Sequence, residues 1–317
     1  MITIHVSEAG SQCGEHFVTL VHMNWQDIAQ AISQASGTTF ELTQHGTVGG
    51  GCINTAMKIS GGGREYFLKL NDASLLDMFE AEADGLRELA AANAVRVPIP
   101  VCTGISGKQC FIVMESLALG GRGGAASMTR FGEQLAQMHR HTAAQFGWQR
   151  DNTIGSTPQI NTWTKDWIVF WREHRLGYQL QLAARNGIGT RTLQKGERLQ
   201  DKLNVFFSGY EPCASVLHGD LWSGNYGISR DDEPVIFDPA VYYGDREADL
   251  AMTELFGGFG REFYAAYNSN WPLDPGYAQR KVLYNLYHIL NHFNLFGGGY
   301  AAQADAMIDR LLHEVSH

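Results

Sequence analysis

An aspartate and an asparagine five positions apart could together carry out phosphoryl transfer. The segment His218-Gly219-Asp220-Leu221-Trp222-Ser223-Gly224-Asn225 follows a short run of strand-forming residues. Transfer of a phosphoryl group needs a carboxylate that orients the acceptor hydroxyl and takes its proton, and a nearby amide oxygen that binds Mg²⁺. A polar turn would use the same residue types in ordinary turn positions. The spacing after a strand favours a catalytic base at Asp220 and a metal ligand at Asn225.

A second carboxylate, Asp238, lies 13 residues after Asn225 in the run Ile236-Phe237-Asp238-Pro239-Ala240. The apolar residues before it predict a strand, and Pro239 ends that strand because proline cannot donate a ladder hydrogen bond. A carboxylate at a strand end is well placed to hold a metal that bridges two phosphates. We therefore expect Asn225 and Asp238 to share one metal ion.

A glycine-rich run lies far upstream, between two strand-like segments. A hairpin turn with positive φ would use the same glycines. The alternative is a nucleotide loop, in which the missing side chains let backbone N–H groups approach phosphate oxygens. The residues that would form such a loop are Gly49, Gly50, Gly51, Cys52 and Asn54. The same N–H groups would favour a thiolate, so Cys52 is either a redox-sensitive residue or a small apolar residue in a turn.

Lys69 is the candidate for binding the phosphates of a nucleotide. It lies in the strand-like run Phe67-Leu68-Lys69-Leu70, after the glycine loop and before a helix that contains Glu80 and Glu82. A Lys–Glu pair would aim the ammonium group at the phosphates. We prefer Glu82 as the partner because it stands in the E-A-x-x-L register of that helix. Lys58 competes for the role, but its strand does not directly precede the helix.

The elements before residue 118 predict a small β-rich lobe. Asn24 can cap a helix that ends at Gly37, and the run 74–92 is an amphipathic helix. Strand-like runs lie at 38–43, 53–59, 65–70, 99–105 and 110–114. We therefore expect a nucleotide-binding lobe over 23–117, with five strands and one main helix, and an extension over 1–22 that the fold does not need.

The elements after residue 126 predict a larger, mostly helical lobe over 127–317. Helical patterns cover 127–142, 163–185, 192–207, 245–256, 274–296 and 301–314, with short β-like runs between 215 and 237. The glycine-rich, aperiodic stretch 118–126 is predicted to be the hinge between the lobes. Together these elements predict a two-lobed α+β fold with its ligand site in the cleft.

Charge and composition exclude other classes of protein. The 317-residue chain has a formal charge of −9, so neither nucleic acid nor an anionic membrane surface is an expected partner. It has no apolar run long enough to span a membrane. Five cysteines without a C-x-x-C pair predict a cytoplasmic protein without a disulfide framework. The 36 glycines predict many turns and close backbone approaches.

The ordered motifs resemble the fructosamine/ketosamine kinase family, which is protein-kinase-like and related to aminoglycoside phosphotransferases. The segments H-G-D-L-W-S-G-N, F-D-P-A-x-x-Y-G-D-R-E-x-D-L-A-M and G-G-G-C-I-N carry the resemblance, as do T-P-Q-I-N-T-W and R-L-G further along the chain. It covers about residues 24–315. The chain departs from protein kinases, because Gly219 replaces the catalytic-loop arginine and no A-P-E segment follows Asp238.

The resemblance implies ATP- and Mg²⁺-dependent phosphorylation of a sugar hydroxyl on a ketosamine, after which the unstable product releases the free amine. It makes Asp220 the base, Asn225 and Asp238 the metal ligands, and Lys69 with Glu82 the phosphate-binding pair. Asp249 would anchor the catalytic loop. The segment expected to contact adenine is Met114, Glu115, Ser116 and Leu117. The candidates for contacting the acceptor are Trp222, Asp245 and Arg246, with core packing as the alternative for Trp222.

The acceptor and the assembly stay open at this stage. The substrate would be a small ketosamine or a glycated protein lysine, and the chain a monomer or a homodimer. A phosphotransferase for another hydroxylated amine, such as an aminoglycoside, is the first alternative. A non-catalytic nucleotide-binding module is less favoured because the catalytic set is complete. His288 and His292 share a helical face, yet their apolar neighbours favour core packing over a metal site.

Overall fold

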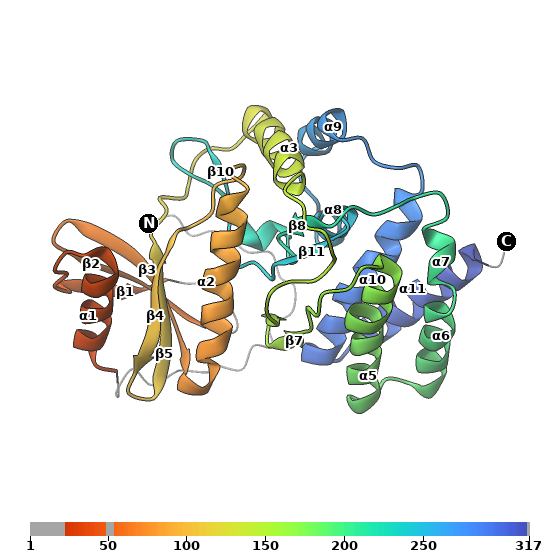
Figure 1. The fold of residues 1–317 in the computed structure, drawn as a ribbon, viewed down its shortest axis with the longest axis horizontal. Coiled ribbons are helices and arrows are strands. Elements are labelled where there is room, and N and C mark those ends of the chain that lie inside the picture. The colour runs from red at the N-terminus through yellow and green to blue at the C-terminus, as the bar shows by residue number, and fades with distance from the viewer. Residues whose placement is uncertain (1–22, 49–53, 316–317) are drawn as a thin grey trace.

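The computed structural model describes residues 23–48 and 54–315, and these residues form a mixed α+β fold (Figure 1). In this part of the chain the N-terminal sheet is antiparallel and has five strands in the order β1-β2-β3-β5-β4. The strands are β1 (Gln44–Thr47), β2 (Thr55–Gly61), β3 (Arg64–Asp72), β4 (Pro100–Ser106) and β5 (Gln109–Glu115). The α+β class and the five-stranded sheet predicted from the sequence are confirmed. Residues 1–22, predicted to be an extension, lie outside the described residues.

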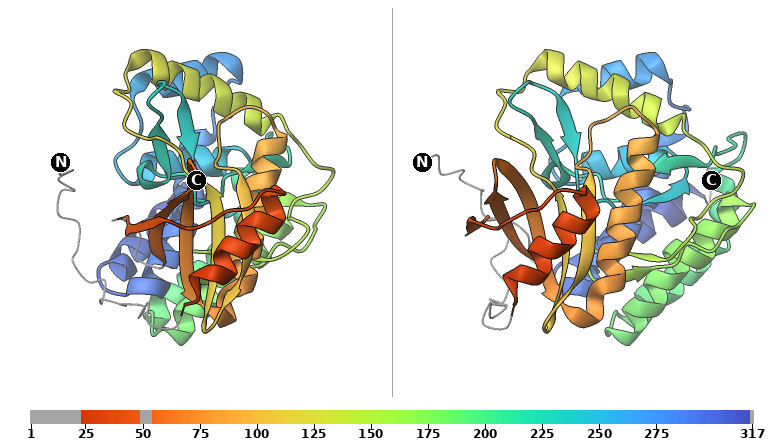
Figure 2. Two further views of the ribbon diagram at one scale, coloured as in Figure 1. Left: turned by 90° about the vertical axis from the view of Figure 1, so that its left-hand side faces the viewer. Right: turned by 60° about the vertical axis from the view of Figure 1, so that its left-hand side comes forward.

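Two helices, α1 (Trp25–Ser36) and α2 (Leu76–Ala91), cover opposite faces of this sheet (Figures 1 and 2). A short 3₁₀ turn, η2 (Ala73–Leu75), leads into α2. Successive side chains of a strand point to opposite faces, and β5 shows this alternation. Val113 packs into the cluster that contains Ile28 of α1, whereas Ile112 packs into the cluster that contains Phe79 of α2. β5 is therefore buried on both sides.

The strand predicted over 38–43 is wrong, because β1 begins only at Gln44, opposite Ser60 of β2. Phe40 is buried, as its apolar side chain requires. The backbone around it finds its hydrogen bonds elsewhere: the Arg64 guanidinium donates to the carbonyl oxygen of Thr39. Side chains satisfy the backbone at Thr39 and Phe40, where Ser33 accepts from the Phe40 N–H at 2.8 Å. Only at Thr43, whose N–H donates to Ser60 of β2 at 2.9 Å, does pairing with the neighbouring strand begin.

The glycine-rich stretch 116–124 links β5 to α3 (Ala125–His139) without regular structure. It lies against the hairpin of β9 (Tyr226–Ile228) and β10 (Pro234–Ile236). The N–H groups of Gly120 and Gly121 both donate to the carbonyl oxygen of Ile228, at 3.0 and 3.2 Å. A Cβ on Gly121 would come within 2.0 Å of the carbonyl oxygen of Ser229. Glycine is therefore required for this close approach.

The rest of the chain is mostly helical and surrounds the short strands that carry the catalytic candidates (Figure 1). In the described part of the chain, no helix is both long and apolar enough to cross a membrane. The further elements are β6 (Asn152–Ile154), β7 (Thr157–Gln159), α4 (Trp167–Phe170), η3 (Trp171–Gly177), α5 (Tyr178–Arg185), α6 (Thr190–Gln200), α7 (Leu203–Phe206), β8 (Ser215–Leu217), η4 (Ser223–Asn225), β11 (Tyr242–Gly244), α8 (Glu247–Leu255), α9 (Arg261–Asn270), α10 (Tyr277–Phe296) and α11 (Tyr300–Glu314).

The helix predicted over 163–185 is present as one uninterrupted helical run, but it begins only at Trp167 and consists of α4, a π-helical segment η3 and α5. The helix begins at Trp167 because the Asp166 carboxylate accepts a hydrogen bond from the N–H of Val169 at 2.8 Å and so caps it. The helix predicted over 192–207 likewise divides into α6 and α7. The sequence analysis missed α9, β6, β7 and β11. The three strands are each three residues long, which is too short for a readable period.

The packing of α3 against α9 yields a prediction about stability. A Cβ on Gly132 of α3 would lie 2.2 Å from the carbonyl oxygen of Phe263 in α9. We expect Gly132→Ala to lower the free energy of unfolding by about 1–3 kcal/mol through overpacking, although alanine is the better helix former. Gly46→Ala is the control, since nothing lies within 4 Å of its Cβ position. Equal urea midpoints for both variants would contradict the prediction.

Candidate active site

The candidate catalytic loop, residues 218–225, follows β8, and one buried carboxylate accepts hydrogen bonds from its backbone. Asp249 of α8 accepts hydrogen bonds from the N–H of His218 at 2.7 Å and from the N–H of Gly219 at 2.8 Å. His139 lies 3.2 Å from the same carboxylate and 2.7 Å from the hydroxyl of Tyr267. Burial alone would raise the pKa of Asp249, but these hydrogen bonds outweigh it and lower that pKa. Asp249 therefore anchors the loop backbone as a carboxylate, in agreement with the expectation from its motif.

Gly219 occupies a position that no other residue could fill without moving the loop. Its φ is +81°, and a Cβ would lie 2.0 Å from the carbonyl oxygen of Ala240. The N–H of Ala240 in turn donates to the carbonyl oxygen of His218 at 2.8 Å. The chain after Asp238 is thus packed directly on the catalytic loop. This contact gives a structural reason for glycine where protein kinases have arginine.

Asp220 and Asn225 lie beside each other, as their spacing predicts. The Asn225 amide donates to Oδ2 of Asp220 at 3.1 Å and to the Asp220 carbonyl oxygen at 2.9 Å. Burial, reinforced by the negative charges of Asp238 and Asp249, raises the pKa of Asp220 to about 7, although the hydrogen bond from Asn225 opposes the shift. A carboxylate with a pKa close to neutral is a suitable general base.

The Lys69 side chain connects the sheet with α2 and with the segment after β10, because it pairs with one carboxylate from each. Its ammonium group lies 2.5 Å from Oε1 of Glu82 and 2.6 Å from Oδ1 of Asp238. Lys69 is only 5% exposed. Burial by itself would lower its pKa, but the two carboxylates outweigh that effect and raise it. Glu82, not Glu80, is the partner, since the Glu80 carboxylate lies 3.8 Å from Arg150 instead.

Asp238 has an unusual backbone conformation. Its φ is +57°, a left-handed region that few residues other than glycine adopt. Asp and Asn adopt this region more readily than other residues that have a side chain, and Asn93 and Asp232 adopt it as well. The Asp238 side chain is 46% exposed, and no described residue hydrogen bonds to its second oxygen. One oxygen of Asp238 is thus bound to Lys69, and the other remains available to a ligand.

The residues present fit a magnesium site. The Asn225 side-chain nitrogen donates its hydrogen bonds to Asp220. The side-chain oxygen of Asn225 makes no hydrogen bond to any described residue and can therefore act as a metal ligand. The Asn225 amide nitrogen also lies 3.4 Å from the carbonyl oxygen of Asp238, which brings the two candidate ligands together. One carboxylate and one amide oxygen, completed by phosphates and water, are the ligands that Mg²⁺ prefers in phosphoryl-transfer sites.

The structure describes only some of the remaining residues that are predicted to bind the nucleotide. Gly49, Gly50, Gly51 and Cys52 lie outside the described residues, so the loop and the redox hypothesis stay predictions. Asn54 accepts a hydrogen bond from the Asn71 amide at 2.7 Å. In the segment expected to contact adenine, Met114 is buried, the Glu115 carboxylate pairs with Arg96, and the Ser116 hydroxyl donates to Glu65 at 2.6 Å. Leu117 is half-buried at the start of the link.

The three candidates for contacting the acceptor separate into two groups. Trp222 is 38% exposed beside the catalytic loop, which does not fit core packing. Asp245 is fully buried and accepts hydrogen bonds from the hydroxyls of Tyr210 and Tyr284. Arg246 is also buried and donates to the carbonyl oxygens of Trp271 and Pro272. The structure brings neither Asp245 nor Arg246 to the surface, so their contacts favour a structural role.

Sequence reasoning missed the polar residues that hold the chain after Asp238. Gln159 donates to the carbonyl oxygen of Ala240 at 3.0 Å, and Asn152 donates to that of Val241 at 2.8 Å. Gln159 also accepts from the hydroxyl of Tyr287 at 2.8 Å. Both amides belong to the β6–β7 hairpin, which the hydrophobic pattern does not reveal. The segment T-P-Q-I-N-T-W, which contains Gln159, carries part of the family resemblance, but nothing in its residue types shows that these amides are buried.

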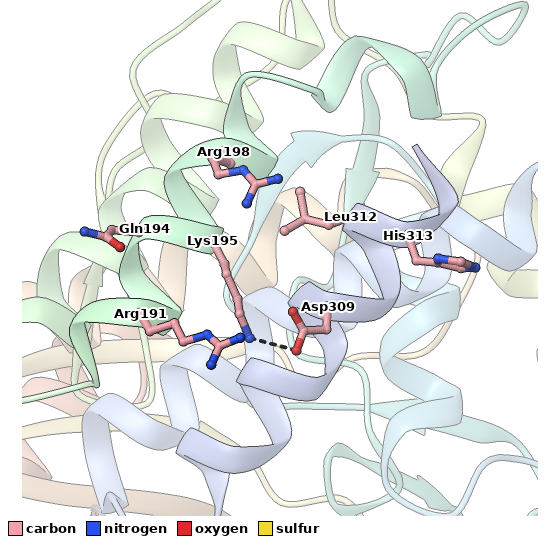
Figure 3. Close-up of a pocket in the computed structure, with 7 residues that line it drawn as sticks. All are labelled: Arg191, Gln194, Lys195, Arg198, Asp309, Leu312 and His313. Atoms are coloured by element: carbon pink, nitrogen blue, oxygen red, sulfur yellow. Dashed lines mark hydrogen bonds and ion pairs between the residues drawn. The ribbon is translucent and has the colours of Figure 1, made fainter. Parts of the chain in front are cut away.

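Two other features lie apart from this site. A hollow of about 530 Å³ opens between α6 and α11, and Figure 3 shows Lys195 reaching across it to Asp309. None of the residues lining it belongs to the catalytic set.

Among residues 23–48 and 54–315, no three His, Cys, Asp or Glu side chains form a metal cluster. His288 is buried, and burial lowers its pKa to about 3, as expected for a core histidine.

Proteins similar to this chain in sequence carry the names ketoamine kinase and protein-ribulosamine 3-kinase. The family model described as fructosamine kinase matches residues 24–314. A "Probable ketoamine kinase" of Synechocystis sp. is 51% identical over 289 residues, which are 91% of this chain and 97% of that protein. The chloroplastic "Protein-ribulosamine 3-kinase" of Arabidopsis thaliana is 44% identical over 301 residues, which are 93% of this chain and 90% of that protein.

Solved structures share the fold over nearly the whole chain. A crystal structure named "Putative fructosamine-3-kinase" from Haemophilus somnus has a TM-score of 0.84 and 31% identity, and the match covers 92% of this chain and 99% of that one. The aminoglycoside phosphotransferase APH(4)-Ia in complex with ADP and hygromycin B has a TM-score of 0.60 and 16% identity, over 90% and 98% of the two chains. At that identity the likeness concerns the fold alone.

The contact between Gly219 and Ala240 yields a prediction about activity. We expect Gly219→Ala to lower kcat at least about tenfold, because the added methyl group displaces the loop that carries Asp220. Gly209→Ala is the matched control, since Gly209 has a φ of +78° but nothing within 4 Å of its Cβ position. Both variants bear the cost of a left-handed alanine, about 1–2 kcal/mol. Steady-state kinetics on folded protein would contradict the prediction if the two variants kept the same kcat.

Proposed function

The chain belongs to the fructosamine kinase family, and on this premise we propose that it transfers the γ-phosphoryl group of ATP to a sugar hydroxyl of a ketosamine. The observation that carries the proposal is the convergence of Lys69, Asp238, Asn225 and Asp220 on one site from three separate parts of the chain. The fold neighbours include a phosphotransferase with ADP bound, which supports the use of a nucleotide.

Each residue of the site has a distinct role in this reaction. Asp220 orients the acceptor hydroxyl and takes its proton as the oxygen attacks the γ-phosphorus. Lys69, held in place by Glu82, binds phosphate oxygens of ATP. Asn225 and Asp238 would hold Mg²⁺, which neutralises charge on the phosphates when it is bound. Because transfer needs little covalent chemistry from the protein, positioning and electrostatic stabilisation supply most of the rate.

The acceptor is a ribulosamine-type or fructosamine-type adduct, phosphorylated at the third carbon as the names of the plant relatives state for those proteins. Phosphorylation there makes the adduct unstable, so the free amine is released and the reaction removes a glycation product.

We place the enzyme in the cytoplasm because of its cysteine content, while the plant relatives are named chloroplastic. Trp222, exposed beside Asp220, would stack on the sugar ring.

Replacement of the base tests the mechanism. We expect Asp220→Asn to lower kcat by about 10²–10⁴-fold, since the amide cannot accept the proton, while ATP still binds. ADP release should be measured with ribulosyl-lysine, fructosyl-lysine and an aminoglycoside in parallel. Asp231→Asn, in an exposed turn, is the control. Near wild-type turnover of Asp220→Asn would remove Asp220 from the mechanism, and turnover of the aminoglycoside alone would remove the ketosamine as substrate.

Metal removal tests the ligands. EDTA should abolish transfer, and added Mg²⁺ should restore it. We expect Asn225→Ala to raise the Mg²⁺ concentration at half-maximal rate about tenfold or more, because one ligand is lost. Asn204→Ala, on the exposed face of α7, should leave that concentration unchanged. An identical Mg²⁺ dependence in the wild type and in Asn225→Ala would show that Asn225 is not a ligand.

A further inference from the structure

Helix α2 carries acidic side chains on two sides, and the mechanism uses only one of them. Glu82 points to Lys69 in the sheet. Asp77, Glu80 and Asp84 are spaced three and four residues apart and so form a row along a different side of α2. We call these three residues the acidic row. Figure 1 shows α2 on the side of the sheet that faces the helical part of the chain.

The acidic row is unfavourable for the helix by itself. Like charges three or four residues apart on a helix repel each other. Only Asp77 lies in the first turn, where the helix dipole favours a negative charge. Arg87, which belongs to α2, pairs with Asp84 at 3.0 Å. In the described part of the chain, the one cation from outside α2 that pairs with the acidic row is Arg150.

Arg150 contacts all three carboxylates of the acidic row. Its guanidinium donates to Oδ2 of Asp84 at 2.7 Å and to Oδ1 of Asp77. The Glu80 carboxylate lies 3.8 Å from the same guanidinium. A single exposed ion pair contributes little, whereas several charges around one guanidinium form a network. Asp77 and Asp84 are about 10 Å apart along the helix axis, so an arginine that binds both of them fixes the position of α2 along that axis.

The chain at Arg150 is itself held in place from the helical part. The Asn161 side-chain nitrogen donates to the Arg150 carbonyl oxygen at 3.1 Å, and the Asn161 N–H donates to the carboxylate of Asp151 at 2.8 Å. Asn161 in turn accepts from the guanidinium of Arg175 at 2.8 Å. Arg175 is fully buried, and its guanidinium lies 4.0 Å from the ring centre of Tyr242. Arg150 therefore extends to α2 from a fixed base.

The packing of α2 on the segment after Asp238 lacks a directional contact. The two meet at Gly85, where the Val241 side chain lies 3.1 Å from the Cβ position of the glycine. A glycine has no side chain that could interlock with its neighbours, and apolar contacts have no direction. The ion pairs of Arg150 add the directional contact that this packing lacks.

We propose that Arg150 is a positioning residue for the nucleotide. By binding the acidic row it keeps Glu82 against Lys69, and so directs the Lys69 ammonium group to the phosphates of ATP. This inference rests on the proposed function, in which Lys69 binds those phosphates. Without Arg150, the repulsion within the acidic row is uncompensated and α2 is free to shift. Lys69 is then left with Asp238 as its partner and loses the orientation that Glu82 gives it.

Direct binding of a non-hydrolysable ATP analogue, measured by calorimetry with Mg²⁺ and without acceptor, tests the inference. We expect Arg150→Ala to raise the Kd of the analogue about fivefold, the upper end of what ion pairs near the surface contribute, and to raise the KM for ATP by the same factor. The KM for ribulosyl-lysine should stay unchanged, which a general loss of structure would not allow. Arg150→Lys keeps the charge but not the fork of two donors, so it should recover part of the affinity.

Arg87→Ala is the matched control, because Arg87 pairs with the same carboxylate of Asp84 but belongs to α2 itself. It should leave the Kd near the wild-type value. Asp84→Asn should raise the Kd, and the double variant of Arg150→Ala with Asp84→Asn should bind no more weakly than Arg150→Ala alone, since both changes remove the same contact. Melting curves should verify that every variant folds.

Three results would overturn the inference. They are an unchanged Kd in Arg150→Ala, equal effects of Arg87→Ala and Arg150→Ala, and additive effects of Arg150→Ala and Asp84→Asn. A wild type that does not bind the ATP analogue would instead refute the proposed function, so the two failures are distinguishable.

Discussion

The buried ammonium group of Lys69 is the interaction on which the site depends. An ammonium group removed from water is unfavourable by several kcal/mol unless opposite charges surround it. Here Glu82 approaches from α2 and Asp238 from the segment after β10, so three parts of the chain must meet for one charge to be tolerated. The sheet and the helical part are thereby joined at the proposed phosphate site. Lys69 uses only one oxygen of Asp238, and the second oxygen, which makes no hydrogen bond to a described residue, is left for the proposed metal.

A second constraint acts from behind the catalytic loop. Buried backbone N–H groups need acceptors, and the loop has no neighbouring strand that could supply them at His218 and Gly219. Asp249 supplies both. On the other side, Gln159 donates to Ala240, the residue on which Gly219 packs. Buried polar groups, Asp249 and Gln159, therefore hold the loop, and their positions determine that of Asp220.

Much of the site could be predicted because its signals are local. Asp220 and Asn225 are five residues apart, and a short loop brings such residues together whatever surrounds it. The sheet was predictable because β2 alternates buried and exposed side chains and β5 is a continuous apolar run, which are the patterns of strands with one and two buried faces. The β6–β7 hairpin was not, because its two strands are short and polar, whereas the equally short β8 and β10 contain apolar residues that mark them as strands. The strand predicted over 38–43 failed for a different reason, since Arg64 satisfies backbone groups that a ladder would otherwise use.

The sequence by itself determined which residue types are present, their order along the chain and the chemistry they allow. Only the tertiary structure decided what each carboxylate does. Asp220, Asp238, Asp245 and Asp249 are the same residue type within 30 positions. Burial raises the pKa of Asp220, Asp238 remains half exposed beside Lys69, and Asp245 and Asp249 are buried as acceptors for neighbouring donors. The different roles of these carboxylates come from their burial and from partners in distant parts of the chain. Lys69 and Asp238, for example, are 169 residues apart and meet only in the folded protein.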